Sequence, residues 1–274
     1  MSSELSIELL GADDAPANVA LSRSVGWKDA LADWHTLHAA ARVLGVRAPG
    51  RLIAQGALGD YGSAATLAKM VVAPEFQGQG LGRRLLEELL APARGRGVPI
   101  GLCATEQGRQ LYEKAGFLPS GELVILFGTP AAGTGEPASV VPLLDAATAI
   151  SLEQRFVRCD RRGMLRARFE QASAAFLSTS EPGFVMASAF EGGTVVGPLF
   201  AQTEATARRL LEAMFARVSG PTRIDVPLQH SALREWLVGL GLREQSLRVE
   251  MASGAKQVPW QVAERFALAT QAWG

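Results

Sequence analysis

A glycine-rich segment between an apolar run and a helical leucine pattern constrains this chain more than any other feature. Residues 67–72 are apolar apart from Lys69 and lead into Ala73 and Pro74. Glycines then alternate at positions 78, 80 and 82, and leucines at 85, 86, 89 and 90 recur with a helical period. The sequence therefore predicts a strand, a glycine-rich turn and a helix, in that order.

Such a turn can bind a phosphate group. Glycine adopts positive φ values easily and lets the backbone approach a ligand, because no Cβ stands in the way. The first turn of a helix exposes N–H groups that have no partner inside the helix, at the positive end of its dipole. We therefore expect a ligand with a phosphate or pyrophosphate at the start of the predicted helix.

Two well-known phosphate loops fit this segment poorly. A dinucleotide fingerprint is spaced G-x-G-x-x-G and is followed by an acidic residue about twenty positions later. The spacing here is G-x-G-x-G, and no acidic residue stands at the expected strand end. A P-loop closes with Gly-Lys-Ser/Thr, whereas Arg83 and Arg84 follow Gly82. A glycine-rich turn without any ligand is the remaining alternative.

A third pattern fits without adjustment: Gln/Arg-x-x-Gly-x-Gly/Ala after a strand that ends in Val-x-Pro. It resembles the pyrophosphate loop of the GNAT (Gcn5-related) N-acetyltransferases, which bind acetyl-CoA. Downstream, the apolar run 98–103 precedes a helix pattern over 107–114 that ends before Gly116 and Phe117. This is similar to the family's "Leu-Tyr-Glu-x-x-Gly-Phe" ending. The resemblance covers residues 20–128, and two motifs in order are more specific than either alone.

The second half repeats the element order of the first half. Residues 128–139 are rich in Gly, Pro and small side chains, which predicts an exposed linker. Beyond it, no glycine-rich loop follows the strand that ends near Pro198. The patterns predict helix over 152–175 with a break near Gly163, strands over 183–190 and 194–200, a helix over 203–218, a strand over 222–226, a helix over 231–240 and a strand over 246–251.

The chain thus resembles tandem proteins in which a working GNAT domain precedes a degenerate one. We expect an acetyl-CoA-binding domain over residues 1–128, a linker over 129–139, and a degenerate domain without the pyrophosphate loop over 140–274. The expected fold class is α/β: each domain has a central, mostly antiparallel mixed sheet with a splayed parallel pair, flanked by helices. The second domain either shapes the acceptor pocket or serves structure or dimerisation.

Composition and charge argue against several classes of partner. The 27 basic and 27 acidic residues cancel, so nothing favours nucleic acid or an anionic membrane. Two cysteines and three scattered histidines do not suggest a metal site, and two free thiols are expected. No apolar stretch has the length of a membrane span and no signal peptide pattern opens the sequence. We expect a cytoplasmic monomer or homodimer.

The resemblance implies where acetyl-CoA lies. Its acyl arm and carbonyl would follow the strand before the loop, and its pyrophosphate would contact the loop amides, with Arg83 or Arg84 adding charge. The residues expected to bind acetyl-CoA are Met70, Val71, Val72, Gln77, Gly78, Gln79, Gly80, Leu81, Gly82, Arg83, Thr105 and Tyr112.

The resemblance also implies direct attack of an amine on the thioester in a ternary complex. Tyr112 is the candidate general acid for the departing thiolate, since a phenol is protonated at neutral pH; an ordinary packed aromatic is the alternative. The general base stays open between a water chain and several side chains, of which Glu106 is included among the catalytic residues. The other candidates are Asp33, His35, His38, Asp60 and Asp225.

The acceptor is a small-molecule or peptide amine that the sequence does not specify further. In the resembling family the early helical region, here 27–43, walls the acceptor site, so Trp27 and Trp34 are candidate substrate contacts; core aromatics are the competing interpretation. Three other functions stay open: an inactive acetyl-CoA sensor or scaffold, an acyltransferase for another acyl-CoA, and an enzyme with an oxygen nucleophile. A nucleotide-dependent oxidoreductase ranks last, because its acidic ribose-binding residue is missing.

Overall fold

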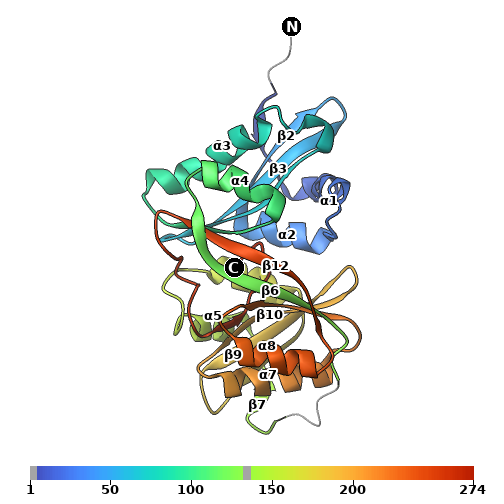
Figure 1. Ribbon diagram of the computed structural model, residues 1–274, viewed down its shortest axis with the longest axis vertical. Coiled ribbons are helices and arrows are strands. Elements are labelled where there is room, and N and C mark those ends of the chain that lie inside the picture. Colours follow the sequence, from blue (N-terminus) through green and yellow to red (C-terminus); the bar gives the residue numbers. More distant parts are fainter. Residues whose placement is uncertain (1–4, 132–136) are drawn as a thin grey trace.

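The computed structural model describes residues 5–131 and 137–274 and forms two similar α/β halves stacked along the long axis (Figure 1). Residues 132–136 of the predicted linker lie outside the described residues. The first half contains β1 (Ile7–Leu9), η1 (Ala12–Asp14), α1 (Ala15–Ser24), α2 (Leu31–Ala40), β2 (Ala41–Ala48), β3 (Arg51–Asp60), β4 (Ala65–Val72), η2 (Pro74–Phe76), α3 (Leu81–Gly95), β5 (Ile100–Ala104), α4 (Glu106–Lys114) and β6 (Leu118–Gly128). The second half contains β7 (Val140–Pro142), α5 (Ala146–Glu153), α6 (Arg162–Glu170), β8 (Ala172–Ser178), β9 (Gly183–Phe190), β10 (Gly193–Ala201), α7 (Glu204–Arg217), β11 (Thr222–Pro227), α8 (Ser231–Gly239), β12 (Arg243–Ser253) and β13 (Arg265–Ala267).

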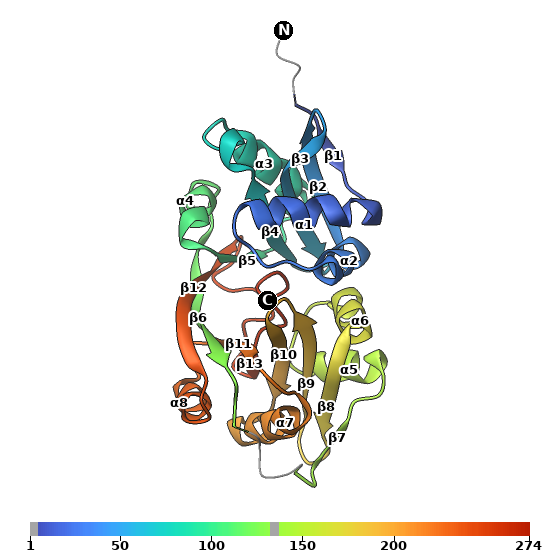
Figure 2. The ribbon, with the colours of Figure 1, turned by 90° about the vertical axis from the view of Figure 1, so that its right-hand side faces the viewer.

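Within the described residues, a single 13-stranded sheet runs through both halves, and two strands change places at its centre. The order β5-β12-β6-β11 puts β12, from the end of the chain, between two strands of the first half. By the same exchange β6 lies between two strands of the second half. Figures 1 and 2 show β6 and β12 side by side along the junction of the halves. Each half therefore completes its sheet with a strand from the other.

The central position of β6 agrees with its sequence. Leu123, Val124, Ile125 and Leu126 are all buried, although consecutive side chains of a strand point to opposite faces. A strand that is apolar on both faces needs a packed layer on each side. β6 meets this condition because Val124 and Leu126 belong to the core cluster that contains Leu233 and Leu237 of α8, whereas Leu123 and Ile125 cluster with Leu268 of the C-terminal segment.

Two parallel pairs interrupt a sheet that is otherwise antiparallel among the described strands. β4 runs parallel to β5, and β10 runs parallel to β11. Helix α3 packs on β3 and β4, whereas α1 and α2 cover the opposite face of these strands; α2 also contacts α6 of the second half (Figure 2). The expected mixed α/β fold with a splayed parallel pair in each half is confirmed. The domain boundaries after residue 128 and before residue 140 stay a prediction.

Two predicted helical segments are too long. Helix α6 ends at Glu170, and residues 172–178, partly assigned to helix, form strand β8. The helical region expected over 27–43 is helix only in α2, since β2 begins at Ala41. In both places the strand is stabilised by hydrogen bonding to the next strand along the chain, β3 for β2 and β9 for β8, which overrides the helix preference of the alanines. Strand β13 was not predicted.

Within residues 5–131 and 137–274, none of the helices combines the length and the apolar character that a membrane span requires.

The strand exchange generates a prediction about the isolated halves. A fragment of residues 1–131 lacks β11 and β12, so β5 loses one neighbour and the apolar strand β6 loses both. We expect this fragment to aggregate, and we expect coexpression with residues 132–274 to restore a complex that unfolds cooperatively. Size-exclusion chromatography and thermal circular dichroism measure both outcomes. A monomeric 1–131 fragment with a sharp melting transition would contradict the expectation.

Candidate functional site

The edge of β4 becomes free where β4 and β5 diverge, and we call the space between the backbones of the two diverging strands the groove. The two strands pair at Ala65–Ile100, Thr66–Gly101 and Leu67–Leu102, and no further pair follows. Beyond this point the second half of β4 has no strand on that edge, so its backbone groups are free to pair with a ligand. Of the residues expected to bind the acyl arm, Val71 is buried, and Met70 and Val72 are half-buried.

The glycine-rich loop forms the end of this groove. Gly78 and Gly80 have φ values of +73° and +78°, a conformation that favours glycine. Gly80 is the N-cap of α3 and provides no side-chain cap, so the first N–H groups of the helix lack an internal acceptor. Amides at the positive end of a 15-residue helix therefore face outward, as an anion-binding site requires.

The polar side chains of the loop stabilise the loop itself. Gln77 Nε2 donates to Val72 O at 2.9 Å, and Gln79 Nε2 donates to Glu75 O at 3.2 Å. Arg83 pairs with Glu87 at 2.8 Å, and its side chain is 78% exposed. The expected charge contribution of Arg83 thus has to come from a mobile surface side chain, while the backbone amides are already in place.

The third glycine of the loop lies where the start of α3 meets β4 and α4. A Cβ at Gly82 would lie 3.4 Å from Val72 Cγ2 and 3.9 Å from Leu111 Cδ2. Helix α3 therefore begins directly against the end of β4 and the side of α4. Leu81 is buried beside it and anchors the first turn.

Helix α4 borders the groove on the β5 side. Thr105 caps it, because its Oγ1 accepts the N–H of Gly108 at 3.2 Å. Glu106 is the first helical residue and is exposed. Tyr112 is 9% exposed and packs edge-on against Phe117, with ring centroids 6.1 Å apart.

Burial keeps the phenol of Tyr112 in its protonated form. Desolvation, with a smaller effect from the neighbouring Cys103, raises the pKa of the phenol well above its usual value. The hydroxyl consequently stays protonated at neutral pH. Burial likewise raises the pKa of the Cys103 thiol, which keeps that sulfur protonated and weakly nucleophilic.

The two tryptophans occupy different environments. Trp34 is fully buried, which matches the core interpretation. Trp27 is half-buried in the connection between α1 and α2, and its ring lies 5.5 Å from Lys69 Nζ of β4. Only Trp27 is therefore placed beside the strand that lines the groove.

The candidate bases mostly have other partners. Asp33 Oδ2 accepts the N–H of Ala30 at 2.9 Å, Asp60 pairs with Arg96 at 2.8 Å, and Asp225 pairs with Arg223 through two bonds of 2.8 and 2.6 Å. His38 Nε2 lies 2.9 Å from Asn18 Oδ1, and burial lowers the pKa of this histidine. His35 is exposed on α2. Four of these five groups are therefore engaged by other protein groups, and His35 is exposed to solvent.

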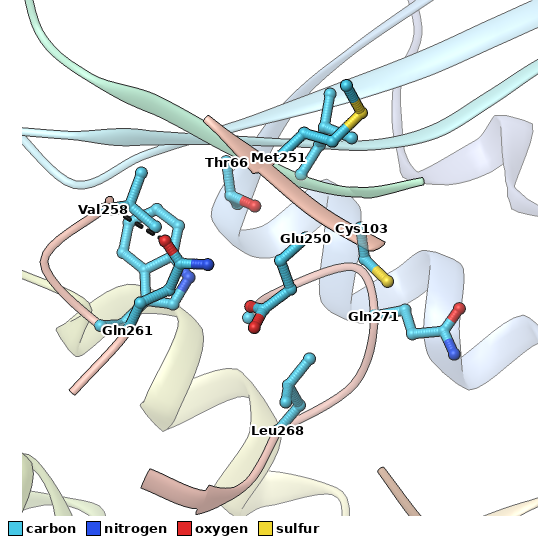
Figure 3. A pocket seen from close by; sticks show the side chains of 11 residues that line it. Thr66, Cys103, Glu250, Met251, Val258, Gln261, Leu268 and Gln271 are labelled. Atoms are coloured by element: carbon cyan, nitrogen blue, oxygen red, sulfur yellow. Dashed lines mark hydrogen bonds between the residues drawn. The ribbon is translucent and has the colours of Figure 1, made fainter. Parts of the chain in front are cut away.

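A small cavity lies beneath Cys103 on the side of the C-terminal segment. Its volume of about 10 Å³ matches a single water molecule. Figure 3 shows Cys103, Glu250 and Gln261 around it. A larger cavity of about 340 Å³ lies across β12, lined by the start of β6, by residues 227–229 and by Arg109 of α4.

The corresponding groove of the second half is filled by the protein itself. β10 and β11 also diverge after three parallel pairs, but β13 enters the opening: Leu199 pairs with Ala267, and Leu268 N donates to Asp225 O at 3.0 Å. Strand β13 thus occupies the edge of β10 that corresponds to the free edge of β4.

An internal carboxylate also occupies the helix start of the second half. Thr203 caps α7 with its own side chain. The carboxylate of Glu181 accepts hydrogen bonds from the hydroxyls of Thr206 and Thr203, the latter at 2.8 Å, and these bonds lower its pKa. Where α3 presents uncapped amides, α7 therefore already holds a negative charge.

The tyrosine position changes as well. In the first half Tyr112 stands four residues before Gly116; in the second half the residue four before Gly241 is Leu237, which is buried. The second half therefore retains the fold and lacks the loop, the open edge and the phenol.

Comparisons with known proteins agree with this duplication. Two family models, each described as an acetyltransferase (GNAT) domain, match residues 39–119 and 149–267. The chain is 25% identical over 228 residues to the uncharacterized N-acetyltransferase YitH of Bacillus subtilis (strain 168), covering 78% of each protein.

Solved structures share the fold over nearly the whole chain. A putative acetyltransferase from Pyrococcus horikoshii superimposes with a TM-score of 0.85 at 19% identity, covering 100% of this chain and 97% of that one. A tandem GNAT protein from the clavulanic acid biosynthesis pathway gives 0.63 at 16% identity, covering 91% and 98%.

Sequence reasoning missed three features of the two grooves. Strand β13 and Glu181 fill the second groove, and Asp29 pairs with Lys69 at the first one. One clue was available for the last of these: Lys69 is the single charged residue in the apolar run 67–72. The other two depend on contacts between distant segments.

The loop geometry predicts the effect of adding one methyl group. Gly80→Ala forces a non-glycine residue into the left-handed region, which costs about 1–2 kcal/mol, and displaces the amides that face the ligand. We expect coenzyme A to bind about 10- to 100-fold more weakly in calorimetry, the loss of one charged hydrogen bond or slightly more.

Gly50→Ala is the matched control. Gly50 has a φ of +87° and open space around it, like Gly80, but lies in the β2–β3 turn. This variant should lose similar thermal stability and keep its affinity for coenzyme A. Equal affinities in the two variants would show that the loop does not bind the cofactor.

Proposed function

Since the chain carries two GNAT acetyltransferase domains in tandem, we propose that its first domain transfers acetyl from acetyl-CoA directly to a primary amine. Membership of this family implies acyl-CoA-dependent acyl transfer. The choice of acetyl-CoA, the amine acceptor and the direct mechanism are the proposal. The observation that carries it is the contrast between an open groove in the first half and a filled one in the second.

The first groove offers separate sites for the two ends of the cofactor. The uncapped amides of α3 suit the pyrophosphate, and the free edge of β4 suits the amide-containing pantetheine arm. In the second half Glu181 and β13 occupy the two corresponding positions. One cofactor per chain follows from this proposal.

The reaction needs a proton donor more than a protein nucleophile. The amine nitrogen attacks the thioester carbonyl carbon, the C–S bond breaks, and the thiolate takes a proton from Tyr112. Backbone N–H groups on the free part of β4 polarise the carbonyl oxygen. Cys103 is a poor candidate for an acyl-enzyme because its thiol stays protonated.

An amine panel tests the proposal. The purified protein is incubated with acetyl-CoA and with phenethylamine, kanamycin, L-lysine or trialanine, and free thiol release is followed. We expect release above the amine-free rate with at least one of these amines, and an acetylated product by mass spectrometry. Binding of coenzyme A without turnover of any amine would favour the sensor or scaffold alternative.

Tyr112→Phe tests the acid. We expect coenzyme A affinity to be unchanged, because the ring still packs on Phe117, and kcat to fall about 100-fold or more, the usual contribution of a general acid. Because burial raises the phenol pKa, the wild-type kcat should show no decline from Tyr112 ionisation below about pH 10. A Tyr112→Phe variant with wild-type kcat would exclude this role.

A further inference from the structure

Strand β4 contains a strained bulge at the point where the groove opens. Ala57 of β3 pairs with Ala68, but Gln55 pairs with Val71, so Lys69 and Met70 together face Gly56. Lys69 has a φ of +55° and is the one non-glycine residue with positive φ in the described part of the chain. Such a conformation persists where surrounding contacts hold it, and it is concentrated at functional sites.

The bulge sends its two side chains to opposite faces of the sheet. A side chain at Gly56 would collide with Met70 and with Leu89 of α3, so Met70 lies on the α3 face. Lys69 lies on the other face, beneath the α1–α2 connection, where it contacts Asp29 and Trp27. Lys69 and Asp29 therefore lie beside the unpaired part of β4, on the face opposite α3.

Lys69 and Asp29 form an ion pair that is nearly closed to solvent. Nζ lies 2.5 Å from Asp29 Oδ1, and the two side chains are 17% and 9% exposed. The second carboxylate oxygen, Oδ2, is buried and has no hydrogen-bond partner among the residues that the structure describes. A buried acceptor without a donor is unfavourable, so this oxygen is suited to a donor that arrives with a ligand.

We propose that Asp29 Oδ2 accepts an N–H of the acceptor's primary amine and that Lys69 holds this amine in its neutral, nucleophilic form. The inference rests on the proposed function and assigns its acceptor-binding residues. An isolated carboxylate would favour the ammonium ion, which has no lone pair for attack. The adjacent Lys69 cation opposes that preference. The ion pair can therefore orient an amine without promoting its protonation.

The step balances without a protein base. The neutral amine attacks the carbonyl carbon, and the resulting cationic nitrogen releases its proton to water. The C–S bond breaks and the thiolate takes the Tyr112 proton, which water then replaces. The products are the N-acetylated amine and coenzyme A.

Other charged or titratable groups near this face are paired, bonded to backbone groups, neutral or exposed to solvent. Arg23 of α1 pairs with Glu191 at 2.9 Å, and Asp33 of α2 caps its own helix. Arg223 pairs with Asp225 on β11, and the Cys103 thiol of β5 is protonated. Arg168 of α6 is buried and donates to backbone carbonyls, and Lys28 is exposed next to Asp29. The ammonium group of Lys69 and the carboxylate of Asp29 are therefore the charges that an amine at the bulge would meet.

The test is the pH dependence of kcat, which reports ionisation within the ternary complex. It uses saturating acetyl-CoA and whichever of the four panel amines the wild-type protein turns over. In Lys69→Met the lone carboxylate favours the ammonium ion, so the acidic limb of the kcat–pH profile should move to higher pH by about one unit. At a given pH on that limb, kcat should therefore fall roughly tenfold. In Asp29→Asn the lone cation favours the neutral amine, so the limb should move down.

Three controls separate this role from a structural one. Lys69→Arg should restore the wild-type limb, and Lys28→Met, which removes an exposed charge on the same connection, should leave it in place. Coenzyme A affinity and the melting temperature show that each variant is folded, and Lys69→Gln replaces Lys69→Met if the latter does not fold.

The outcomes are distinct. Limbs that move in opposite directions support the inference. Limbs that stay at the wild-type position, or that move in the same direction, overturn it while the proposed function stands. If the wild-type protein acetylates none of the four amines, the proposed function fails and this inference fails with it.

Discussion

The backbone pairing of β6 with β12 is the contact on which the rest of the structure depends. Each of these strands belongs to one half by sequence and completes the sheet of the other half by hydrogen bonding. Neither half has a closed set of strands without this exchange. The two halves are consequently joined through the middle of one continuous sheet, and the groove between β4 and β5 has a rigid neighbour, β12, supplied by the far end of the chain.

The repeated sheet geometry produces two grooves, of which the first is open and the second is filled. Both parallel pairs separate after three residue pairs, because the geometry of the sheet is repeated. What differs is the chemistry at the opening. The first half has glycines with positive φ and an uncapped helix, and the second has a side-chain cap, a carboxylate from Glu181 and an inserted strand. The second groove is thus occupied by the protein's own backbone and charge.

The candidate site was predictable to the extent that its residues are contiguous. Gly78, Gly80 and Gly82, the preceding strand and the buried Tyr112 lie in two short segments whose patterns describe local geometry. Trp34 is buried in the core although Trp27, seven residues earlier, lies beside the groove. A helix pattern alone does not separate these two environments, because the buried face of α2 depends on which elements pack against it.

The sequence by itself determined the strand–loop–helix unit, the position of the tyrosine and the repeated order of elements. These features follow from interactions between residues close in the chain: glycine conformation, helix periodicity and capping. Tertiary structure alone decided that β6 and β12 exchange partners, that β13 fills the second groove, and that Asp29 meets Lys69 at the bulge. Each of these is a pairing between distant segments, and local patterns carry no information about which distant partner a strand edge or a charge will find.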